Sequence, residues 1–394
     1  MNATRRRTGF FAVVIREWRR IVRSPFQVMM LLGLPLLGGW LIVSVFGSGA
    51  ARDLPIAVVD HDASPLSRDF VRMIDATGGV RVSSIGADLD AAERLVLRGE
   101  VYGVVSIPPH FERDAARGEA PVVTAFYNAQ YVLPASQIKN ALSSATATLS
   151  ARIEFRQRGA ARELPQVAAA RVEPIALDVH ALFNPSLNYV TYLVSALLPT
   201  LLQIFIATVT VHAYAGELRD ATAGEWFATA GGRSLPAIAG KAVPYAVHFT
   251  ALGLLMLAVL YGRLGVPFQG SFAAVGWATA LFVLAYVAMG FAFAAAAGEL
   301  GFGTSLAAFY CAPAFAFAGV TFPVEGMPLV GQAWGSLLPV THYLRILVQQ
   351  GMRGAPIEAS WHAVAALAVF CAAPWPFLAW RMARLARATR ETHG

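Results

Sequence analysis

"YVTYLVSALLPTLLQIFIATVTVHA", residues 189–213, decides the fold class of this chain. The stretch contains no Asp, Glu, Lys or Arg, and about 20 apolar residues in helical form are enough to cross the hydrocarbon core of a bilayer. It is followed closely by "GELRDATAGEWFATAGGRS", residues 216–234, which mixes both signs of charge around a tryptophan. Together the two stretches predict a membrane-spanning helix that leads into a short polar segment at the membrane surface.

The composition of the whole chain agrees with this interpretation. Of 394 residues, 56% are hydrophobic and 14% are charged, whereas soluble domains carry about 25% charged residues. A net charge of +7 would suggest nucleic acid as the partner of a soluble protein. Here the arginines cluster beside apolar stretches, so membrane orientation explains the charge and we expect no nucleic-acid partner.

Charge-free intervals predict six membrane spans. The first lies at 24–47, where no cleavage site follows the apolar run, so it is expected to stay as an anchor. The second is the stretch at 189–213, and the other four lie between Lys241 and Arg263, Arg263 and Glu299, Glu299 and Glu325, and Glu358 and Arg381. Glycine and proline interrupt the apolar run at 325–355, which predicts outer re-entrant or interfacial short helices; a seventh span is the competing interpretation.

The basic residues predict the orientation of these spans. They gather in the N-terminal segment, around the polar segment and in the C-terminal tail: Arg5, Arg6, Arg7, Arg16, Arg19, Arg20, Arg23, Arg219, Arg233, Lys241, Arg381, Arg384, Arg387 and Arg390. Positive residues favour the cytoplasmic side, so both termini and residues 217–230 are expected in the cytoplasm. The insert at 48–185 is then outside, and 186–394 holds spans two to six with the basic tail.

The insert has the pattern of a mixed α/β domain. Four short β-branched runs, "PIAVVD", "VRVSSI", "VYGVVSIP" and "PVVTAFYN", alternate with helical patterns. Ser64 is the expected N-cap of the first helix, with Pro65 at its first position. A long helix at 135–158 carries one stripe, for packing or for a partner, of Ile138, Leu142, Leu149 and Ile153. A strand-like run at 171–179 leads back to the membrane.

Residues 1–23 contain a predicted amphipathic helix. Its apolar face comprises Phe11, Val14, Ile15, Trp18, Ile21 and Val22, and its basic face Arg16, Arg19, Arg20 and Arg23. We expect Arg16, Trp18, Arg19 and Arg20 to hold this helix in the membrane interface, with the indole at headgroup depth. The alternative is a cytoplasmic extension of the first span.

The sequence shows no catalytic, cofactor or metal site, so enzymatic activity is not expected. The pair Gly240-Lys241 lacks the other residues of a phosphate-binding loop. "DHD" at 60–62 offers metal ligands, but aspartate is equally expected where a strand ends before a helix cap. Cys311 and Cys371 lie in apolar runs, which argues against a disulfide framework.

Three polar side chains lie inside predicted spans. His248 either relays protons or bonds a neighbouring helix, and the second interpretation is favoured. Gln203 and Tyr310 either line a translocation path or join helices to one another.

Residues 217–230 form the main cytoplasmic feature between spans. Helical indexing predicts a short helix that ends at Gly231-Gly232. Trp226 and Phe227 would supply apolar area to a partner, and the charged residues would fix its register. The alternative, a solvated loop, would leave both aromatic rings exposed.

Motifs in order along almost the whole chain resemble those of the permease subunits of type-2 ABC exporters with a large external domain. They are "LPIAVVDHDASPLSRDFV" (54–71), "VYGVVSIPPHFERDAARGEAP" (101–121), "FNPSLNYVTYLV" (183–194), "GKAVPY" (240–245), "FPVEGMP" (322–328) and "PVTHYLRILVQQGMRG" (339–354). The polar segment matches at Glu217, Arg219-Asp220, Thr222 and Glu225-Trp226. Ala221 stands where the family has glycine, so a less tightly turned backbone is expected there.

The resemblance implies a fold and a function. The chain would be an α-helical protein of the bacterial inner (plasma) membrane, with six spans, an inserted α/β extracytoplasmic domain and type-2 ABC exporter permease architecture. Residues 217–230 would be the coupling helix that docks a separate ATP-binding subunit, which holds the ATP and Mg²⁺; this chain would bind no cofactor. A second permease, in a homodimer or heterodimer, would complete the transporter, and periplasmic membrane-fusion adaptors and an outer-membrane duct are further implied partners.

Two functions remain open at this point. The first is export of a hydrophobic or amphipathic substrate, drug or lipid-like, out of the cytoplasm or inner leaflet. The second is a membrane-anchored scaffold or receptor whose periplasmic domain binds a partner without transport. Only the first requires the polar segment at 217–230 to be intolerant of substitution.

Overall fold

The computed structural model describes residues 8–47, 49, 52–161, 183–185 and 187–391. The chain divides into two compact units, a helical unit of Met1–Gly49 with Asn188–Gly394 and an α/β unit of Ala50–Leu187. The predicted strand-like run at 171–179 lies outside the described residues.

The α/β unit contains one four-stranded sheet. Its elements are β1 (Leu54–Asp60), α4 (Pro65–Asp75), β2 (Val80–Gly86), α5 (Leu89–Leu97), β3 (Gly103–Ile107), α6 (Phe111–Ala116), β4 (Thr124–Tyr127) and α7 (Val132–Ala161). The strand order is β2-β1-β3-β4. β1 is parallel to both neighbours, whereas β4 runs antiparallel to β3. The predicted α/β insert is therefore confirmed, and the Ser64 hydroxyl caps α4 by accepting the N–H of Ser67 at 3.0 Å.

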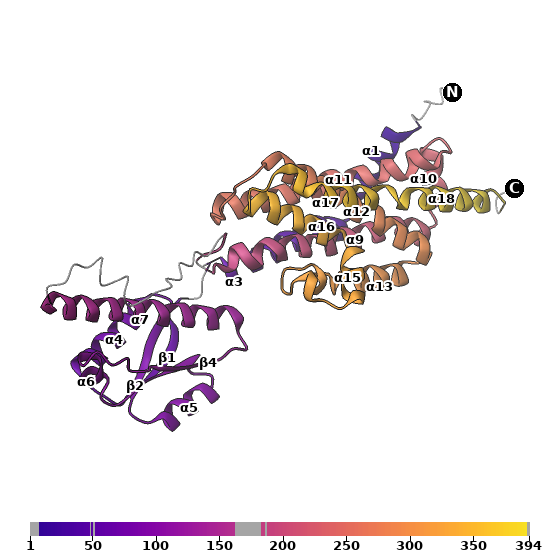
Figure 1. Cartoon of the computed structure of the whole chain (residues 1–394). Coiled ribbons are helices and arrows are strands. Elements are labelled where there is room, and N and C mark those ends of the chain that lie inside the picture. Colours follow the sequence, from indigo (N-terminus) through magenta and orange to yellow (C-terminus); the bar gives the residue numbers. More distant parts are fainter. Residues whose placement is uncertain (1–7, 48, 50–51, 162–182, 186, 392–394) are drawn as a thin grey trace. The chain divides into compact units, whose positions relative to one another are not determined.

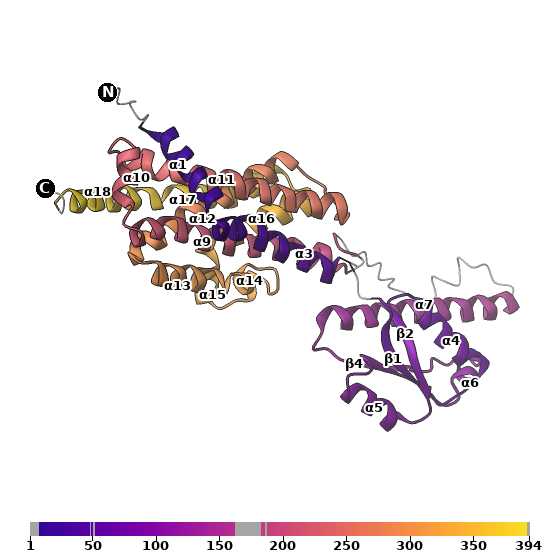
Figure 2. The same ribbon diagram turned by 180° about the vertical axis from the view of Figure 1, so that it is seen from behind.

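Helices cover both faces of this sheet, as Figures 1 and 2 show. On one face, α4 and α7 bury Ile56, Phe70 and Ile74. The stripe on α7 packs into this same core, where Ile138 and Leu149 are almost fully buried. The stripe is therefore a packing face. On the opposite face, α5 packs on alternate side chains of β1 and β3.

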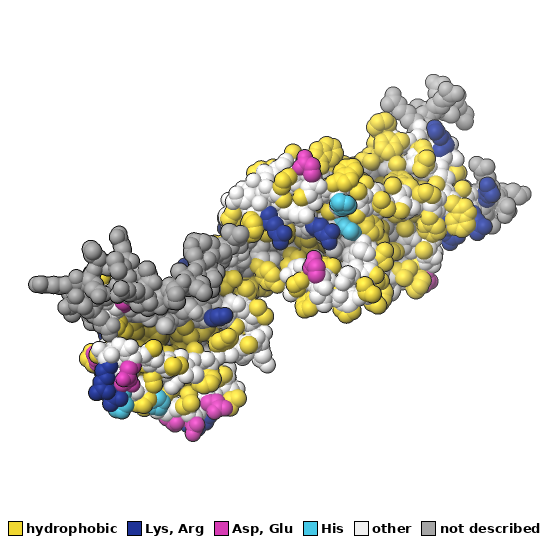
Figure 3. Space-filling model, viewed as in Figure 1, with side chains coloured by type: hydrophobic (Ala, Val, Ile, Leu, Met, Phe, Trp, Pro, Cys, Tyr) yellow, Lys and Arg dark blue, Asp and Glu magenta, His cyan; other side chains and the backbone are white. Residues whose placement is uncertain are grey.

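The helical unit contains, among its described residues, six helices long and apolar enough to cross a membrane: Pro25–Phe46, Val190–Arg219, Ser234–Arg263, Phe272–Ala297, Leu300–Phe317 and Ile357–Leu385. They comprise α2 (Pro25–Val28), η1 (Met29–Gly33) and α3 (Leu34–Phe46); η2 (Val190–Val194) and α9 (Ser195–Arg219); α11 (Ser234–Ala258) and η3 (Val259–Arg263); α12 (Phe272–Ala297); α13 (Leu300–Cys311) and α14 (Ala314–Phe317); η6 (Ile357–Ser360), α17 (Trp361–Ala372) and α18 (Pro374–Glu391). The six predicted spans are confirmed. In Figure 3, the surface of the helical unit between the charged side chains at its two ends is mostly hydrophobic, as a lipid environment requires.

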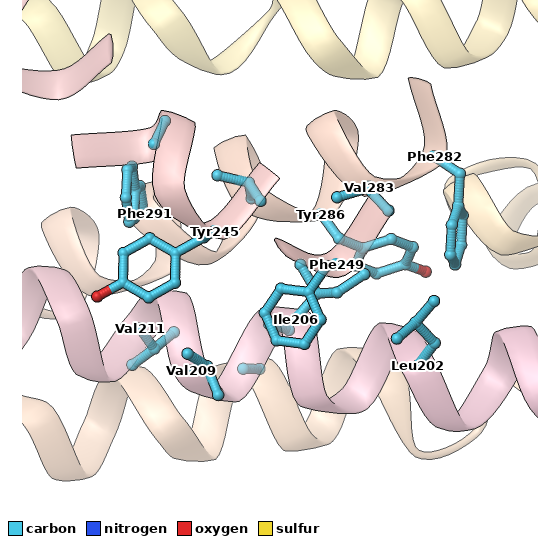
Figure 4. Close-up of a cluster of buried hydrophobic side chains, with 14 of the residues drawn as sticks. Leu202, Ile206, Val209, Val211, Tyr245, Phe249, Phe282, Val283, Tyr286 and Phe291 are labelled. Atoms are coloured by element: carbon cyan, nitrogen blue, oxygen red, sulfur yellow. The ribbon is translucent and has the colours of Figure 1, made fainter. Parts of the chain in front are cut away.

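The core of this unit lies around α9, the most buried of the six spans. Figure 4 shows side chains of α9, α11 and α12 that meet there, including Ile206, Phe249 and Tyr286. His248 of α11 also joins two helices, since its Nε2 lies 3.0 Å from the backbone oxygen of Leu31 in η1. The favoured interpretation of His248, a bond to a neighbouring helix, is confirmed.

Short helices replace a seventh span between α14 and η6. They are η4 (Val324–Gly326), α15 (Leu329–Ser336), α16 (Pro339–Ile346) and η5 (Leu347–Met352). α15 has 8 residues, and α16, with 8 residues, continues into the 6 residues of η5. Both helices remain shorter than the roughly 20 residues that a span needs. Gly335 allows α15 to lie against α14, because a Cβ at this position would lie only 2.7 Å from the backbone oxygen of Phe317. The interrupted apolar run is thus a pair of short helices.

Candidate functional site

Four elements meet at the end of the helical unit where α10 is labelled in Figures 1 and 2. They are α1 (Phe10–Arg23), the last turn of α9, α10 (Ala223–Thr229) and the first turns of α11. Gly240 permits the close contact of α1 with α11, since a Cβ at this position would lie 2.8 Å from the backbone oxygen of Phe10. α1 is also tied to α10 through the N–H of Gly9, which donates to the backbone oxygen of Thr229 at 2.8 Å.

Glu217, in the last turn of α9, is the centre of this junction. Its side chain is fully buried and is shared by three basic residues. Arg16 donates to both carboxylate oxygens, at 2.6 and 3.0 Å, and Lys241 donates at 2.8 Å. Arg20 forms a further ion pair, and the Thr222 hydroxyl donates to the same carboxylate. Burial opposes the charge of Arg16, but its hydrogen bonds to Glu217 raise the Arg16 pKa above its ordinary value.

Lys241 links Glu217 to a second buried carboxylate, that of Glu17 on α1. The Lys241 ammonium lies 2.5 Å from Glu17, and the Tyr245 hydroxyl donates to the other Glu17 oxygen at 2.6 Å. Lys241 and Glu17 are both inaccessible to solvent. Buried charges are costly unless they are paired, and here each one is. We name the set Glu17, Glu217, Lys241, Arg16 and Arg20 the charge cluster.

Two members of the charge cluster are not among the site residues predicted from the sequence. Lys241 is predicted only as a charged flank of the third span, whereas α11 begins at Ser234 and Lys241 lies buried inside the helix. Glu17 carries no prediction. A signal was present, because Val13, Glu17 and Ile21 recur at i, i+4 and i+8 and are the buried residues of α1.

The rest of α1 also differs from the predicted two-faced helix. Arg16 and Arg20 turn inward to Glu217, while Arg19 is exposed. Ile21, which was predicted on the lipid-facing apolar side of the helix, is buried against the rest of the unit. The remaining exposed apolar stripe consists of Phe11, Ile15, Trp18 and Val22. The correction follows from tertiary contacts, because Glu217 and Lys241 supply partners that draw the arginine side of α1 inward.

Trp226 does not offer its ring to a partner, as the sequence had suggested. The side chain is fully buried, and its indole N–H donates to the backbone oxygen of Ala237 at 3.0 Å. Its ring meets Tyr214 edge-on, with centroids 5.4 Å apart, and Lys241 lies 4.9 Å above it. Trp226 therefore fixes α10 to α9 and α11. The prediction that its ring supplies apolar area to a partner is wrong, because the ring is buried within this chain.

The exposed polar surface of this segment lies beside Trp226. Glu225 is 67% exposed and lies 3.9 Å from Arg16, at the rim of the charge cluster. Asp220 pairs with Arg219 at 2.9 Å and with Arg20 at 3.0 Å. The hydrogen bond from Arg219 is the main reason that the pKa of Asp220 lies below its usual value. Asp220 is therefore anionic at neutral pH, and the side chains of Asp220 and Glu225 both face solvent.

The predicted helix at 217–230 is two pieces. α9 continues to Arg219, and α10 begins only at Ala223. Between them, Ala221 has a φ of 56°, in the left-handed region. The expectation of a less tightly turned backbone at Ala221 is therefore wrong, since alanine adopts here the conformation that glycine favours.

Gln203 and Tyr310 hold helices together in this structure. Gln203 is fully buried, donates to the backbone oxygen of Cys311 at 3.4 Å and accepts from the Tyr286 hydroxyl. The Tyr310 hydroxyl donates to the backbone oxygen of Leu337, before α16. An apolar cavity lies nearby, between α9, α11 and α12, with Leu198, Met256 and Phe282 in its wall. Gln203 and Tyr310 are not part of that wall.

The aspartates of "DHD" have structural partners. Asp60 accepts the N–H groups of Asp62 and Ala63 and the hydroxyl of Ser67, at 3.1, 2.9 and 2.6 Å. Asp62 accepts the N–H of Glu112 at 3.0 Å. Within the described part of the chain, no group of three or more His, Cys, Asp or Glu side chains is placed to hold a metal ion.

Comparison with known proteins adds to this geometry. A family model described as "ABC-2 family transporter protein" matches residues 25–380. The chain is 23% identical over 353 residues to "Probable multidrug ABC transporter permease YbhS" of Escherichia coli (strain K12), a match that covers 85% of this chain and 86% of that protein. It is 25% identical over 201 residues to "Probable multidrug ABC transporter permease YbhR" of the same strain, over 50% of this chain and 53% of that protein.

Proposed function

The chain belongs to the ABC-2 transporter family, and from this premise we propose that it is the membrane-spanning subunit of an ATP-driven exporter. ATP and Mg²⁺ would be bound and hydrolysed by a separate subunit. The substrate class that fits is hydrophobic or amphipathic, drug-like or lipid-like, because the spans are apolar and two relatives are named multidrug permeases. We further propose that a second permease completes the transporter, and that an adaptor and an outer-membrane duct extend it.

The charge cluster is the observation that carries this proposal. It bonds α1, α9 and α11 to one another, and Trp226 and Thr222 attach α10 to the same junction. A displacement of α10 by an ATP-binding subunit would therefore move two spans and the N-terminal helix together. Packed interiors with few voids transmit such a displacement rather than absorb it.

The docking residues are the exposed ones. Arg219, Asp220 and Glu225 present charge to the solvent around α10, and such charges select partner and register. Arg16 and Arg20 act from behind, as positioning residues that hold Glu217. The arginine distribution supports a cytoplasmic location for this end of the unit, on the side where ATP is available. The exposed apolar stripe of α1 then suits the membrane interface.

A charge reversal at Glu225 tests the docking role. Glu225→Lys changes an exposed side chain outside the buried cluster, so the permease should still fold and insert. We expect the co-expressed ATP-binding subunit to co-purify at a level reduced about tenfold or more, the effect of placing like charges at an interface. The matched control is Glu358→Lys, which reverses an exposed acid in η6, away from α10.

The outcomes separate the exporter from the scaffold. Loss of co-purification and of substrate-stimulated ATP hydrolysis in Glu225→Lys alone supports the exporter. Equal co-purification in Glu225→Lys and Glu358→Lys, with transport retained in both, removes α10 as the docking element. A folded permease that never associates with an ATP-binding subunit would favour the scaffold or receptor.

A further inference from the structure

The two edges of the α/β sheet differ in their protection from solvent and from other strands. On β2, the Asp75 carboxylate accepts the N–H of Val82 at 2.8 Å, and Arg81 places an exposed charge on the strand. A charged side chain on an edge strand, together with a capped N–H group, hinders pairing with another strand. The β2 edge is protected in this way.

Among the residues that the structure describes, the β4 edge has neither form of protection. All four residues of Thr124–Tyr127 are exposed, and Phe126 is 53% exposed. Val122 and Val132, on either side of the strand, are 76% and 73% exposed. Residues 121–132 contain no charged side chain. An exposed, uncharged and apolar edge strand is a template on which another strand can pair.

The register of β4 on β3 shows which groups are free to bond. β4 pairs with β3 so that Phe126 lies opposite Val104, and Asn128 donates its N–H to Tyr102 at 2.8 Å. In an antiparallel ladder only alternate residues bond to the same neighbour. Phe126 therefore directs its N–H and C=O toward β3, while Ala125 and Tyr127 direct theirs outward.

We propose that β4 is where the α/β units of two copies of this chain meet, by antiparallel pairing of the two β4 strands about a two-fold axis at Phe126. This inference rests on the proposed function, which calls for two permeases. Ala125 of each copy exchanges N–H and C=O bonds with Tyr127 of the other. The two Phe126 residues form the central non-hydrogen-bonded pair, with Cα atoms about 4.5 Å apart and rings in contact.

The chemistry of the edge favours a second copy as the partner. A two-fold contact presents the same patch from both sides, so the patch must be complementary to itself. The outward bonds at Ala125 and Tyr127 fulfil this, since each supplies what the other needs. The absence of charge from 121–132 removes the like-charge repulsion that self-pairing would otherwise meet. The strand is short, and pairing of the membrane-spanning units would raise the local concentration at which the edges meet.

Disulfide trapping tests the pairing in the full-length permease in membranes. In a Cys311→Ala, Cys371→Ala background, Phe126→Cys places one thiol at the two-fold axis, within disulfide reach of its own copy. We expect a covalent permease dimer on mild oxidation. Ile85→Cys is the matched control, because it also replaces an exposed hydrophobic residue, but on the protected β2 edge, and it should give no covalent dimer.

A second variant checks that backbone pairing causes the disulfide. Ala125→Pro removes only an outward N–H, which edge strands tolerate, so the bonds to β3 remain. It should lower the yield of Phe126→Cys dimer about tenfold, since two symmetric hydrogen bonds are lost.

Three results would overturn the inference: no Phe126→Cys dimer from a permease that elutes as a folded species, a disulfide only to another protein such as an adaptor, or a dimer yield unchanged by Ala125→Pro. The proposed function fails separately, by the Glu225→Lys result. A permease that docks its ATP-binding subunit but gives no Phe126→Cys dimer loses the β4 contact alone.

Discussion

Carboxylates in both units of the molecule bind arginine, but in different surroundings. In the charge cluster, Glu217 is completely buried between Arg16 and Lys241. In the α/β unit, Asp69 is 25% exposed and bonds Arg152 at 2.5 Å and Arg72 at 3.1 Å. Both sites show short, charge-assisted bonds. Burial decides what each is worth, since water can replace a lost partner of Asp69 but cannot reach Glu217.

The contrast indicates different roles. An exposed ion pair contributes about 0–1 kcal/mol, because solvent screens it and side-chain entropy opposes it. Breaking a buried pair costs about 3–5 kcal/mol, because a charge is left without a partner. The charge cluster therefore holds its helices in one arrangement, whereas the pairs around Asp69 adjust with little consequence. Rigid attachment is what the junction below α10 needs for transmission of force.

The largest expected effect follows from Lys241→Met. The substitution keeps the approximate length of the side chain but leaves Glu17 and Glu217 buried without their shared cation. We expect the free energy of unfolding to fall by about 3–5 kcal/mol, measured as a lower melting temperature of the detergent-solubilised permease. The double variant Lys241→Met, Glu17→Gln should recover part of the loss. A melting temperature equal to that of the wild type would show that the cluster is not a tightly coupled buried site.

A smaller effect of opposite sign is expected from Ala221→Gly. Ala221 adopts a φ of 56° between α9 and α10, and a left-handed conformation costs a non-glycine residue about 1–2 kcal/mol. Glycine should therefore raise the melting temperature, with a gain reduced to about 1 kcal/mol by its greater freedom in the unfolded chain. Ala228→Gly, in α10, is the control and should destabilise. A loss of stability in Ala221→Gly would contradict the strained turn.

The smallest effect is expected from Asp69→Asn in the α/β unit. The change weakens the bonds to Arg152 and Arg72, both more exposed than Asp69. We expect the free energy of unfolding to change by less than about 1 kcal/mol. Equal destabilisation by Asp69→Asn and Lys241→Met, in the same melting assay, would remove the distinction between the two sites.

Much of the fold follows from local patterns. Charge-free intervals gave the six spans, because a bilayer sets the length of an apolar helix. Alternating β-branched runs gave the strands of the insert, and Ser64 marked the start of α4. The polar segment was located at the right place in the chain. The structure inside that segment was not predicted correctly, since α10 is shorter than expected and the Trp226 side chain is buried.

The sequence by itself thus determined the spans, the α/β insert and the positions of the charges, because these depend on neighbours within one or two helical turns. Only the tertiary structure decided that Glu17, Glu217 and Lys241 meet, and that β2 and β4 form edges of different character. Helical and strand periodicity tell which side chains share a face, but not which element that face will contact. That choice is made by residues far apart in the chain, such as Glu17 and Lys241, when the helices pack and each buried charge must find its partner.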